Sequence, residues 1–299
     1  MVTITSYDEH IVVFKSLQSP KKITYVDQNG RRRSFLVKAN DDLRKDQRVM
    51  EVFNLLIKYN LKIRKYVVVP ISSKLGIIEW IHGLISLKSI CMTGQNKQVA
   101  TEIFKKYKKK LGKHFSTFNS RTKSVLAGWY NDTYKDPVHW HTAKHCYAKT
   151  LAIMSAFGYF IGLGDRHCEN ILVDTRTGDV VHVDLNLLFG RASMLSVPER
   201  VPFRLTKNVR ECLGVLRETG KFRLYVRGTI RTIVRFRDVI EANLLAFVYD
   251  PVAEIRRPGE MIKTFFSKLE GDDLVDRLIK EAVDDGNLGE MYVGWMPFI

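Results

Sequence analysis

The chain has 299 residues, of which 45% are hydrophobic and 27% are charged, a composition typical of a folded soluble domain and unlike that of a disordered chain. Lysine and arginine number 48 against 32 aspartates and glutamates, so the formal net charge is +16. This charge favours an anionic partner: a nucleotide, a nucleic acid, an acidic protein or a membrane surface. Four scattered cysteines support neither a disulfide framework nor a zinc site, and they indicate a reducing compartment.

The first eighty residues are predicted to be rich in β-structure. Five segments combine β-branched and aromatic residues and are predicted strands: 10–17, 21–27, 31–38, 66–70 and 76–81. Asn29-Gly30 favours a hairpin between the second and third of them. A helix is predicted from Asp41 onward, because apolar residues recur at roughly helical spacing from Leu43 to Ile57.

From about residue 85 the pattern becomes mainly helical. Asp136-Pro137 is typical of an N-cap followed by proline in the first turn, and the helix that it begins is predicted to end near Ile161. Its apolar stretch 151–164 is too short to span a bilayer, and no secretory signal is visible at the N-terminus. A β-rich lobe followed by a helical lobe indicates an α+β fold with a cleft between the lobes.

Asp165, Asn170 and Asp184 form the most informative chemical pattern. Asp165 and Asn170 are five residues apart on a polar loop, and Asp184 follows the next predicted hairpin. Phosphoryl transfer needs one carboxylate for the hydroxyl proton, and an asparagine oxygen and a second carboxylate that hold magnesium over the phosphates. The alternative is a polar loop in which aspartate and asparagine form only turn hydrogen bonds.

Lys38 ends an otherwise apolar strand, and Asp46 follows eight residues later on the predicted helix. This spacing predicts a phosphate-binding lysine that a carboxylate holds in place. No glycine-rich phosphate motif is present, so the phosphate loop is predicted at 16–22, with Ser16 and Lys21 as candidate contacts. Alone, a solvated lysine and an ordinary Ser/Pro turn explain these features better. Together with the acidic pattern, they favour the functional interpretation.

These residues lie in stretches that resemble the phosphatidylinositol 3-kinase-related protein kinases, and among them the ATR branch of checkpoint kinases. The matching stretches are SLQSPKKI (16–23), KANDDLRKDQRVMEVF (38–53), VVPISSKLGIIEWI (68–81), IGLGDRHCENILVD (161–174), GDVVHVDLNLLF (178–189) and VPERVPFRLTKNV (197–209). The segment NLGEMYVGWMPFI (287–299) resembles the FATC tail. The resemblance implies a bilobal protein-kinase-like fold, divided into an N-lobe (1–80), a C-lobe (81–266) and a FATC tail (267–299).

The resemblance also implies roles for individual residues. Asp165 is the implied catalytic base, Asn170 and Asp184 are the implied metal ligands, and His167 is implied to stabilise charge on the transferred phosphoryl group. The implied ATP-binding residues are Ser16, Lys21, Lys38, Asp46, Glu79, Trp80 and Ile81. Within this set, Trp80 is expected to pack on adenine, and the backbone of 79–81 is expected to form the hinge hydrogen bonds.

The implied activity is that of a non-specific serine/threonine protein kinase that uses ATP with Mg²⁺, or with Mn²⁺ in its place. The resemblance implies Ser/Thr-Gln sites on protein substrates, DNA-damage checkpoint signalling and a nuclear location. A regulatory subunit is expected to bind through regions absent from this sequence, and any association with DNA is expected to be indirect. The helical solenoid expected ahead of the kinase domain is also absent, which leaves a fragment, an incomplete gene model or a reduced protein.

Three other functions stay open: a TOR-like growth-signalling kinase, a phosphoinositide kinase, and an inactive basic scaffold or nucleic-acid-binding module. The activation segment 184–204 holds three scattered arginines (Arg191, Arg200 and Arg204), which favours a protein substrate over an anionic lipid headgroup. The basic run 105–113 suggests the binding module, although a solvated helix face explains it more simply. Apolar residues at helical spacing from Leu274 to Val283 predict that the tail packs on the helical lobe.

Overall fold

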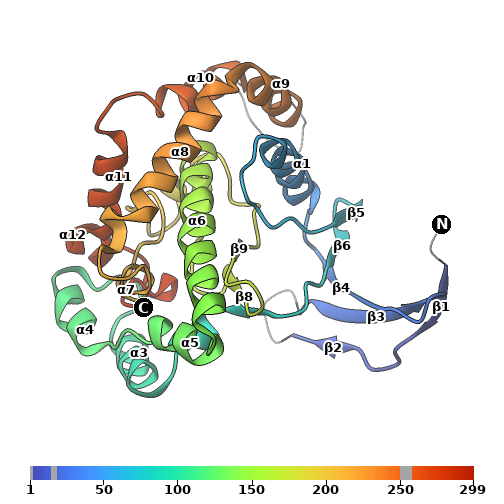
Figure 1. Cartoon of the computed structure of the whole chain (residues 1–299), viewed down its shortest axis with the longest axis horizontal. Helices are drawn as coiled ribbons and strands as arrows, with labels where there is room; N and C mark the ends of the chain where they lie inside the picture. Colours follow the sequence, from blue (N-terminus) through green and yellow to red (C-terminus); the bar gives the residue numbers. More distant parts are fainter. Residues whose placement is uncertain (1–2, 15–18, 250–257) are drawn as a thin grey trace.

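The computed structural model describes residues 3–14, 19–249 and 258–299. A β-rich lobe precedes a mainly helical lobe (Figure 1), which confirms the predicted α+β bilobal architecture. The strands are β1 Ile4–Tyr7, β2 Val12–Val13, β3 Lys21–Asp27, β4 Arg32–Ala39, β5 Val68–Ser72, β6 Leu75–Glu79, β7 Leu84–Ser86, β8 Ile171–Asp174 and β9 Val180–His182. The predicted boundaries of the N-lobe, C-lobe and tail stay a prediction.

The helices follow the β-rich lobe with one exception, α1, which is inserted between two of its strands. They are α1 Arg44–Lys58, α2 Leu87–Cys91, α3 Gly94–Lys106, α4 Phe115–Arg121, α5 Leu126–Thr133, α6 Pro137–Ile161, α7 Lys207–Cys212, α8 Lys221–Arg235, α9 Arg237–Val248, α10 Pro258–Ser267, α11 Leu274–Val283 and α12 Asp285–Gly289. Short 3₁₀ turns are η1 Gly112–His114, η2 Arg191–Met194, η3 Arg217–Thr219 and η5 Val293–Trp295. Across the described ranges, no helix is long and apolar enough to cross a bilayer.

The β-rich lobe is an antiparallel sheet in the order β1-β3-β4-β6-β5, with β2 added to β3. Helix α1 packs on β5 and buries its apolar face, including Val49, Phe53 and Leu56. In the pairing of β4 with β6, Leu36 lies opposite Ile78 and Lys38 lies opposite Gly76. Residues directly opposite each other in an antiparallel pair point to the same side of the sheet. Leu36, Lys38 and Ile78 therefore share one face, which turns toward the second lobe.

Three local predictions differ from the structure. The strand expected at 10–17 is reduced to β2 at residues 12–13, and 15–18 lie outside the described residues. The helix expected from Asp41 begins at Arg44, and Asp41 lies in the loop before it, where its carboxylate accepts a hydrogen bond from Lys38. The segment at 84–86 is strand β7 rather than helix, because it pairs with β8. Such pairing joins segments far apart in the chain, and local periodicity does not reveal it.

Helix α6 is the central element of the helical lobe, with α8 and β9 against it (Figure 1). The Asp136 side chain accepts the His139 N–H at 2.8 Å, and Pro137 occupies the first turn, as predicted. Gly162 ends the helix with a φ of 63°. A Cβ at this position would lie 2.4 Å from the Gly190 nitrogen, so glycine is required both for the turn and for the close approach.

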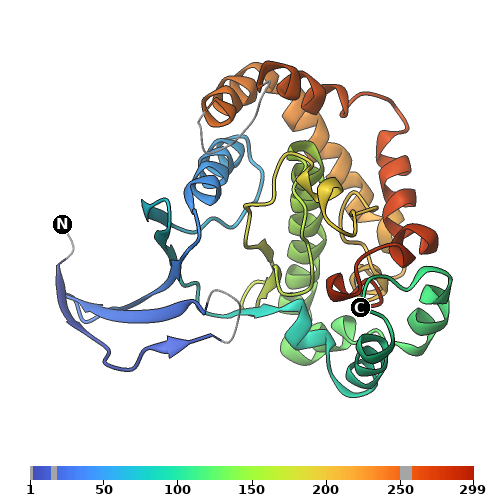
Figure 2. The same ribbon diagram turned by 180° about the vertical axis from the view of Figure 1, so that it is seen from behind.

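The tail packs on the helical lobe, as the apolar stripe predicted. Helix α11, which carries the apolar stripe, contacts α8. Helix α12 contacts α4, and η5 contacts α3 (Figure 2). Trp295 is 4% exposed, and its ring lies 3.7 Å from the guanidinium carbon of the buried Arg204. Arg204 also donates to the backbone oxygens of Trp295 and Met296. The tail is therefore part of the core of the lobe.

Replacing Trp295 by alanine removes a buried indole and the stacking partner of Arg204. We expect Trp295→Ala to lower the free energy of unfolding by about 3–5 kcal/mol, measured by urea denaturation. Tyr292→Ala is the matched control in the same tail, because Tyr292 is 50% exposed and its loss should cost about 1 kcal/mol or less. Equal effects of the two substitutions would contradict a core role for the tail.

Candidate active site

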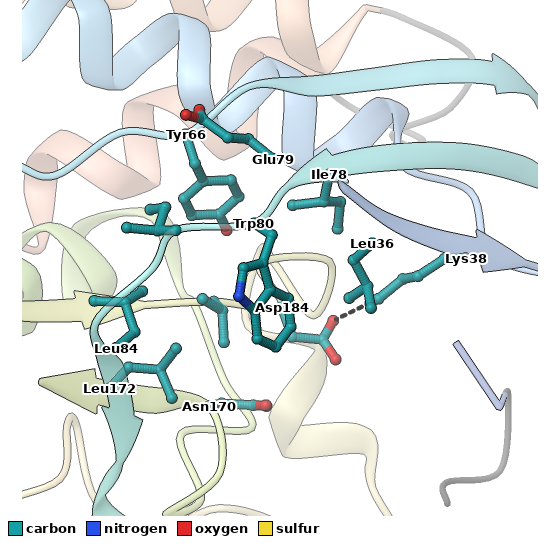
Figure 3. A pocket seen from close by; sticks show the side chains of 12 residues that line it. Leu36, Lys38, Tyr66, Ile78, Glu79, Trp80, Leu84, Asn170, Leu172 and Asp184 are labelled. Atoms are coloured by element: carbon teal, nitrogen blue, oxygen red, sulfur yellow. Dashed lines mark ion pairs between the residues drawn. The ribbon is translucent and has the colours of Figure 1, made fainter. Parts of the chain in front are cut away.

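A cavity of about 280 Å³ lies between the two lobes. Its lining residues are Leu36, Lys38, Tyr66, Ile78, Glu79, Trp80, Ile81, Leu84, Asn170, Leu172, Val183 and Asp184. Figure 3 shows Lys38 and Asp184 joined by an ion pair, with Trp80 and Asn170 facing the same space. The cavity combines apolar walls with a few convergent polar groups, which is typical of a small-molecule site.

Lys38 is the cation of this cavity and is only 9% exposed. Its Nζ lies 3.0 Å from Asp41 Oδ2 and 3.8 Å from Asp184 Oδ1. Burial by itself would lower the pKa of Lys38, but attraction to Asp184 and Asp41 outweighs burial, and the pKa is raised. The ammonium is therefore fully charged at neutral pH and can bind an anionic group.

Asp46 does not hold Lys38 directly, so the predicted pairing is corrected: Asp41 makes that contact. The Asp46 carboxylate is completely buried and accepts the backbone N–H of Leu185 at 3.0 Å. Its second oxygen has no hydrogen-bond partner. Burial raises the pKa of Asp46 to about 6, although the Leu185 N–H opposes the shift. Asp46 thus holds the residue that directly follows Asp184.

Asp165 and Asn170 are brought together by the loop after α6. The Asn170 side-chain N–H₂ donates to the Asp165 carbonyl oxygen at 2.9 Å, and this bond leaves the amide oxygen of Asn170 toward the cavity. Asp165 has a φ of 57°, and its N–H donates to Glu199 Oε1 at 2.8 Å. The predicted pair is therefore fixed by its own loop and by Glu199.

His167 lies beside Asp165 in the same loop. Its Nδ1 accepts the Glu169 N–H at 3.1 Å, so the proton of the neutral ring is on Nε2. This Nε2 lies 3.9 Å from Asp165 Oδ2. Burial lowers the pKa of His167, although Asp165 attracts the charged form. A neutral imidazole can donate one hydrogen bond from Nε2 toward a group next to Asp165.

Two buried arginines complete the site, and neither was predicted to do so. Arg166 donates to the carbonyl oxygens of Gly164 at 2.8 Å and Val183 at 2.9 Å, and also to that of Asp184. Arg204 donates to the Arg166 carbonyl oxygen at 2.8 Å. The available sequence signal was the position of Arg204 between the apolar residues 203 and 205, because an arginine in an apolar run is a candidate buried ion.

The hinge segment 79–81 forms the edge of the cavity where the two lobes join. The Glu79 N–H donates to the Val67 carbonyl oxygen, and the Trp80 N–H donates to that of Ser34. Within the described part of the chain, the Ile81 N–H has no hydrogen-bond partner, so it is the hinge donor available to a ligand. The Trp80 ring stacks on Phe14 at 5.5 Å between centroids.

The predicted phosphate loop is only partly described. Ser16 lies outside the described residues. Lys21 pairs with Val37, on the face of the sheet opposite to Lys38, because side chains alternate along a strand. The neighbouring Lys22 pairs with Leu36 on the cavity face, and its Nζ lies 5.0 Å from the Trp80 ring centroid. The prediction for Lys21 is therefore corrected in favour of Lys22.

Asp184 and Asn170 offer oxygen atoms that suit a hard divalent cation. Asp184 Oδ1 is buried without a hydrogen-bond partner, as expected of an oxygen kept for an ion. Among the residues that the structure describes, no three His, Cys, Asp or Glu side chains gather into a metal site. A cation held here would therefore take further ligands from a bound phosphate or from water.

The raised pKa of Asp46 predicts how the stability of an Asp46 variant depends on pH. The pKa is raised from 3.8 to about 6 in the folded protein, so the folded state binds more protons between these values and loses stability as pH rises through them. Asp46→Asn should remove this loss. Its effect on the free energy of unfolding should therefore be more favourable at pH 7 than at pH 4.5, by on the order of 2 kcal/mol.

The measurement is urea denaturation of both proteins at the two pH values. Asp42→Asn is the matched control, because the Arg44 side chain lowers the pKa of Asp42. Because this carboxylate is ionised in the folded and the unfolded state at pH 4.5 and above, the effect of Asp42→Asn should be nearly equal at the two pH values. A pH-independent effect of Asp46→Asn would show that Asp46 is ionised throughout.

Known proteins have sequences similar to the whole of this chain. A family model described as phosphatidylinositol 3- and 4-kinase matches residues 33–257, and a FATC domain model matches residues 272–299. The probable serine/threonine-protein kinase MEC1 homolog of Encephalitozoon cuniculi is 41% identical over 318 residues, which cover 100% of this chain and 18% of that protein. Protein kinase rad3 of Schizosaccharomyces pombe is 32% identical, with coverage of 99% and 14%.

Serine/threonine-protein kinase ATR of Drosophila melanogaster is 32% identical, with coverage of 100% of this chain and 14% of that protein. The solved FAT and kinase domain of CtTel1 matches with a TM-score of 0.89 at 28% identity, over 99% of this chain and 24% of that chain. The chain thus spans less than a fifth of the length of these curated relatives. The predicted resemblance is confirmed: the chain belongs to the phosphatidylinositol 3- and 4-kinase family, carries a FATC domain at residues 272–299, and is similar to MEC1, rad3 and ATR.

Proposed function

We propose that the chain transfers the γ-phosphoryl group of ATP to serine or threonine side chains of proteins. The observation that carries this proposal is the 3.8 Å contact between the Lys38 ammonium and the Asp184 carboxylate, across a cavity that the hinge and Asn170 also line. A nucleotide with adenine at the Ile81 N–H would direct its phosphates toward this pair. The names of the relatives, which include serine/threonine-protein kinases, support the same reaction.

Each polar residue of the cavity has a distinct task in this proposal. Lys38 binds the phosphates, and Asp165 accepts the proton of the attacking hydroxyl. The His167 Nε2–H donates to the transferred phosphoryl group. Asn170 and Asp184 would hold Mg²⁺ or Mn²⁺, which when bound neutralises charge on the phosphates. Catalysis by these residues is mainly placement and charge stabilisation, because phosphoryl transfer asks little covalent chemistry of the protein.

The activation segment 184–204 supports a protein substrate over a lipid headgroup. Arg204 is 2% exposed and is committed to the tail, so it cannot contribute to a headgroup site. Arg191 is half-buried, which leaves Arg200 as the one well-exposed arginine of this segment. Met194 is 84% exposed and Leu195 is 40% exposed. A peptide can cover such apolar side chains, whereas a multiply phosphorylated headgroup needs clustered cations.

The cellular context is proposed from the family resemblance, which the relatives named ATR and MEC1 support. The proposed role is DNA-damage checkpoint signalling in the nucleus at Ser/Thr-Gln sites, with a regulatory subunit and an indirect DNA association through regions outside this sequence. A TOR-like role is the less favoured alternative, because the relatives reported above are MEC1, rad3 and ATR. An inactive scaffold is disfavoured because Lys38, Asp165, Asn170 and Asp184 are all present, with Lys38 and Asp184 in contact and Asn170 bonded to Asp165.

Replacing Asp165 and replacing Asp184 should have different effects on phosphoryl transfer and on ATP binding. Asn is the chosen substitution because both residues have positive φ angles, which asparagine tolerates. Asp165→Asn should lower the rate of peptide phosphorylation by about 10²- to 10⁴-fold and leave ATP affinity nearly unchanged. Asp184→Asn should abolish turnover and also weaken metal-dependent ATP binding. Radioactive phosphate transfer and calorimetry measure the two quantities.

Glu169→Gln is the matched control, since Glu169 lies in the same loop but is exposed and pairs with Lys88. Its turnover should stay within about threefold of the unchanged protein, because an exposed ion pair contributes little. Wild-type turnover in either aspartate variant would contradict the proposed roles.

The substrate class is tested by competition. Offered a Ser-Gln peptide and phosphoinositide vesicles side by side, the chain should transfer labelled phosphate to the peptide. A Ser-Ala peptide reports the preference for glutamine. Labelled lipid without labelled peptide would make the chain a phosphoinositide kinase.

A further inference from the structure

We propose that residues 105–113, here named the lysine segment, form a direct, sequence-independent binding site for nucleic acid. The segment runs from the last turn of α3 to η1 and reads KKYKKKLGK. Six of its nine residues are lysines, and all six are exposed. The proposed kinase reaction does not use it, and it lies at the end of the helical lobe away from α1 and α9 (Figures 1 and 2).

The buried Leu111 and the half-buried Tyr107 anchor the lysine segment to the helical lobe between its lysines. Leu111 is 2% exposed, and the Tyr107 ring packs edge-on against Phe118 at 5.6 Å between centroids. The Lys109 carbonyl oxygen accepts the N–H of Val293 from the tail at 2.8 Å. With Tyr107 and Leu111 turned inward, the lysines are left on the outside. Because the backbone of the segment is already ordered, binding of a ligand costs less conformational entropy.

Most of this charge is not neutralised by the protein itself. Lys110 pairs with Glu290, and Lys113 shares an open pocket with Asp284 and Asp285. Four lysines, namely Lys105, Lys106, Lys108 and Lys109, have no ion pair among the residues that the structure describes. The nearby Glu102 is bonded to Arg121. The four ammonium groups thus form a concentrated positive surface that lacks a counter-ion.

Stabilisation of helix α3 can explain the presence of only two of these four lysines. Lys105 and Lys106 lie in the last turn of α3, where positive charge favours the C-terminal end of a helix. Lys108 and Lys109 lie beyond the helix, where the interaction with its dipole falls off. Placing them beside two like charges costs repulsion, which a bound polyanion would remove.

The number and spacing of the lysines favour a polyanion with regularly spaced phosphates. The segment contains no arginine, and lysine meets phosphate as a point charge without a fixed geometry, which suits sequence-independent contacts. Duplex DNA offers one phosphate charge per about 1.7 Å of its axis, a density that suits closely spaced lysines. Membrane insertion would need a larger apolar surface than Phe104 provides beside the segment, since it is only 38% exposed. Electrostatic binding to anionic lipid without insertion is measured as a separate outcome of the test.

The test measures binding of the 299-residue chain to fluorescein-labelled duplex and single-stranded DNA across a salt series. A variant with glutamine at Lys105, Lys106, Lys108 and Lys109 should bind duplex DNA at least about tenfold more weakly, with a log–log salt slope shallower by up to about 4. A variant with arginine at the same four positions should keep the affinity. Both variants should keep the thermal stability and peptide-kinase rate of the unchanged chain, since the exchanged side chains are exposed.

The matched control replaces four exposed lysines elsewhere by glutamine and lowers the net charge equally: Lys58, Lys74, Lys263 and Lys280. Its affinity should stay within about twofold of the unchanged chain, because local rather than total charge sets the contacts. An equal loss in this control would overturn the proposal, as would the absence of DNA binding by the unchanged chain at moderate salt. Equally tight binding of polyglutamate or of anionic vesicles would overturn the assignment to nucleic acid. None of these results depends on kinase activity.

Discussion

Two buried arginines, Arg166 and Arg204, hold the segments around the cavity together through a chain of hydrogen bonds. Arg166 bonds carbonyl oxygens of the catalytic loop and of the segment that ends in Asp184, and Arg204 bonds the carbonyl oxygen of Arg166 itself. Burial lowers the pKa of both arginines, although neighbouring acidic groups favour their charged forms. A buried cation without hydrogen bonds costs several kcal/mol. Each carbonyl is therefore kept in place, because moving it would leave a buried charge unsatisfied.

Arg204 also joins the tail to the helical lobe. Arg204 extends from the carbonyl oxygen of Arg166 to those of Trp295 and Met296, with its guanidinium stacked on the Trp295 indole. The side chain of Arg204 thus links the tail directly to the loop that carries Asp165. The tail also holds the lysine segment through the hydrogen bond from Val293 to Lys109. Residues 272–299 therefore act as a structural support for two separate surfaces of the lobe.

The sequence predicted those features whose signals are local. The helix from Pro137 to Ile161 has a cap at one end and a glycine at the other, so both of its ends were predicted. The partner of Lys38 was not, because Asp41 and Asp46 both lie within reach of it in sequence. Only the late start of α1 at Arg44 leaves Asp41 in the loop beside the lysine. Long-range packing decides which of the two aspartates pairs with Lys38, and the spacing of residues along the chain does not reveal that packing.

The two central carboxylates occupy backbone conformations that cost energy. Asp165 and Asp184 have φ angles of 57° and 56°, in the left-handed region that costs a non-glycine residue about 1 kcal/mol or more. Glu199 bonds the N–H of Asp165, and Arg166 bonds the carbonyl oxygen of Asp184. These contacts hold each residue in its strained conformation before any ligand arrives. In the proposed reaction, carboxylates that are already held in place leave the binding energy of a nucleotide available to position its phosphates.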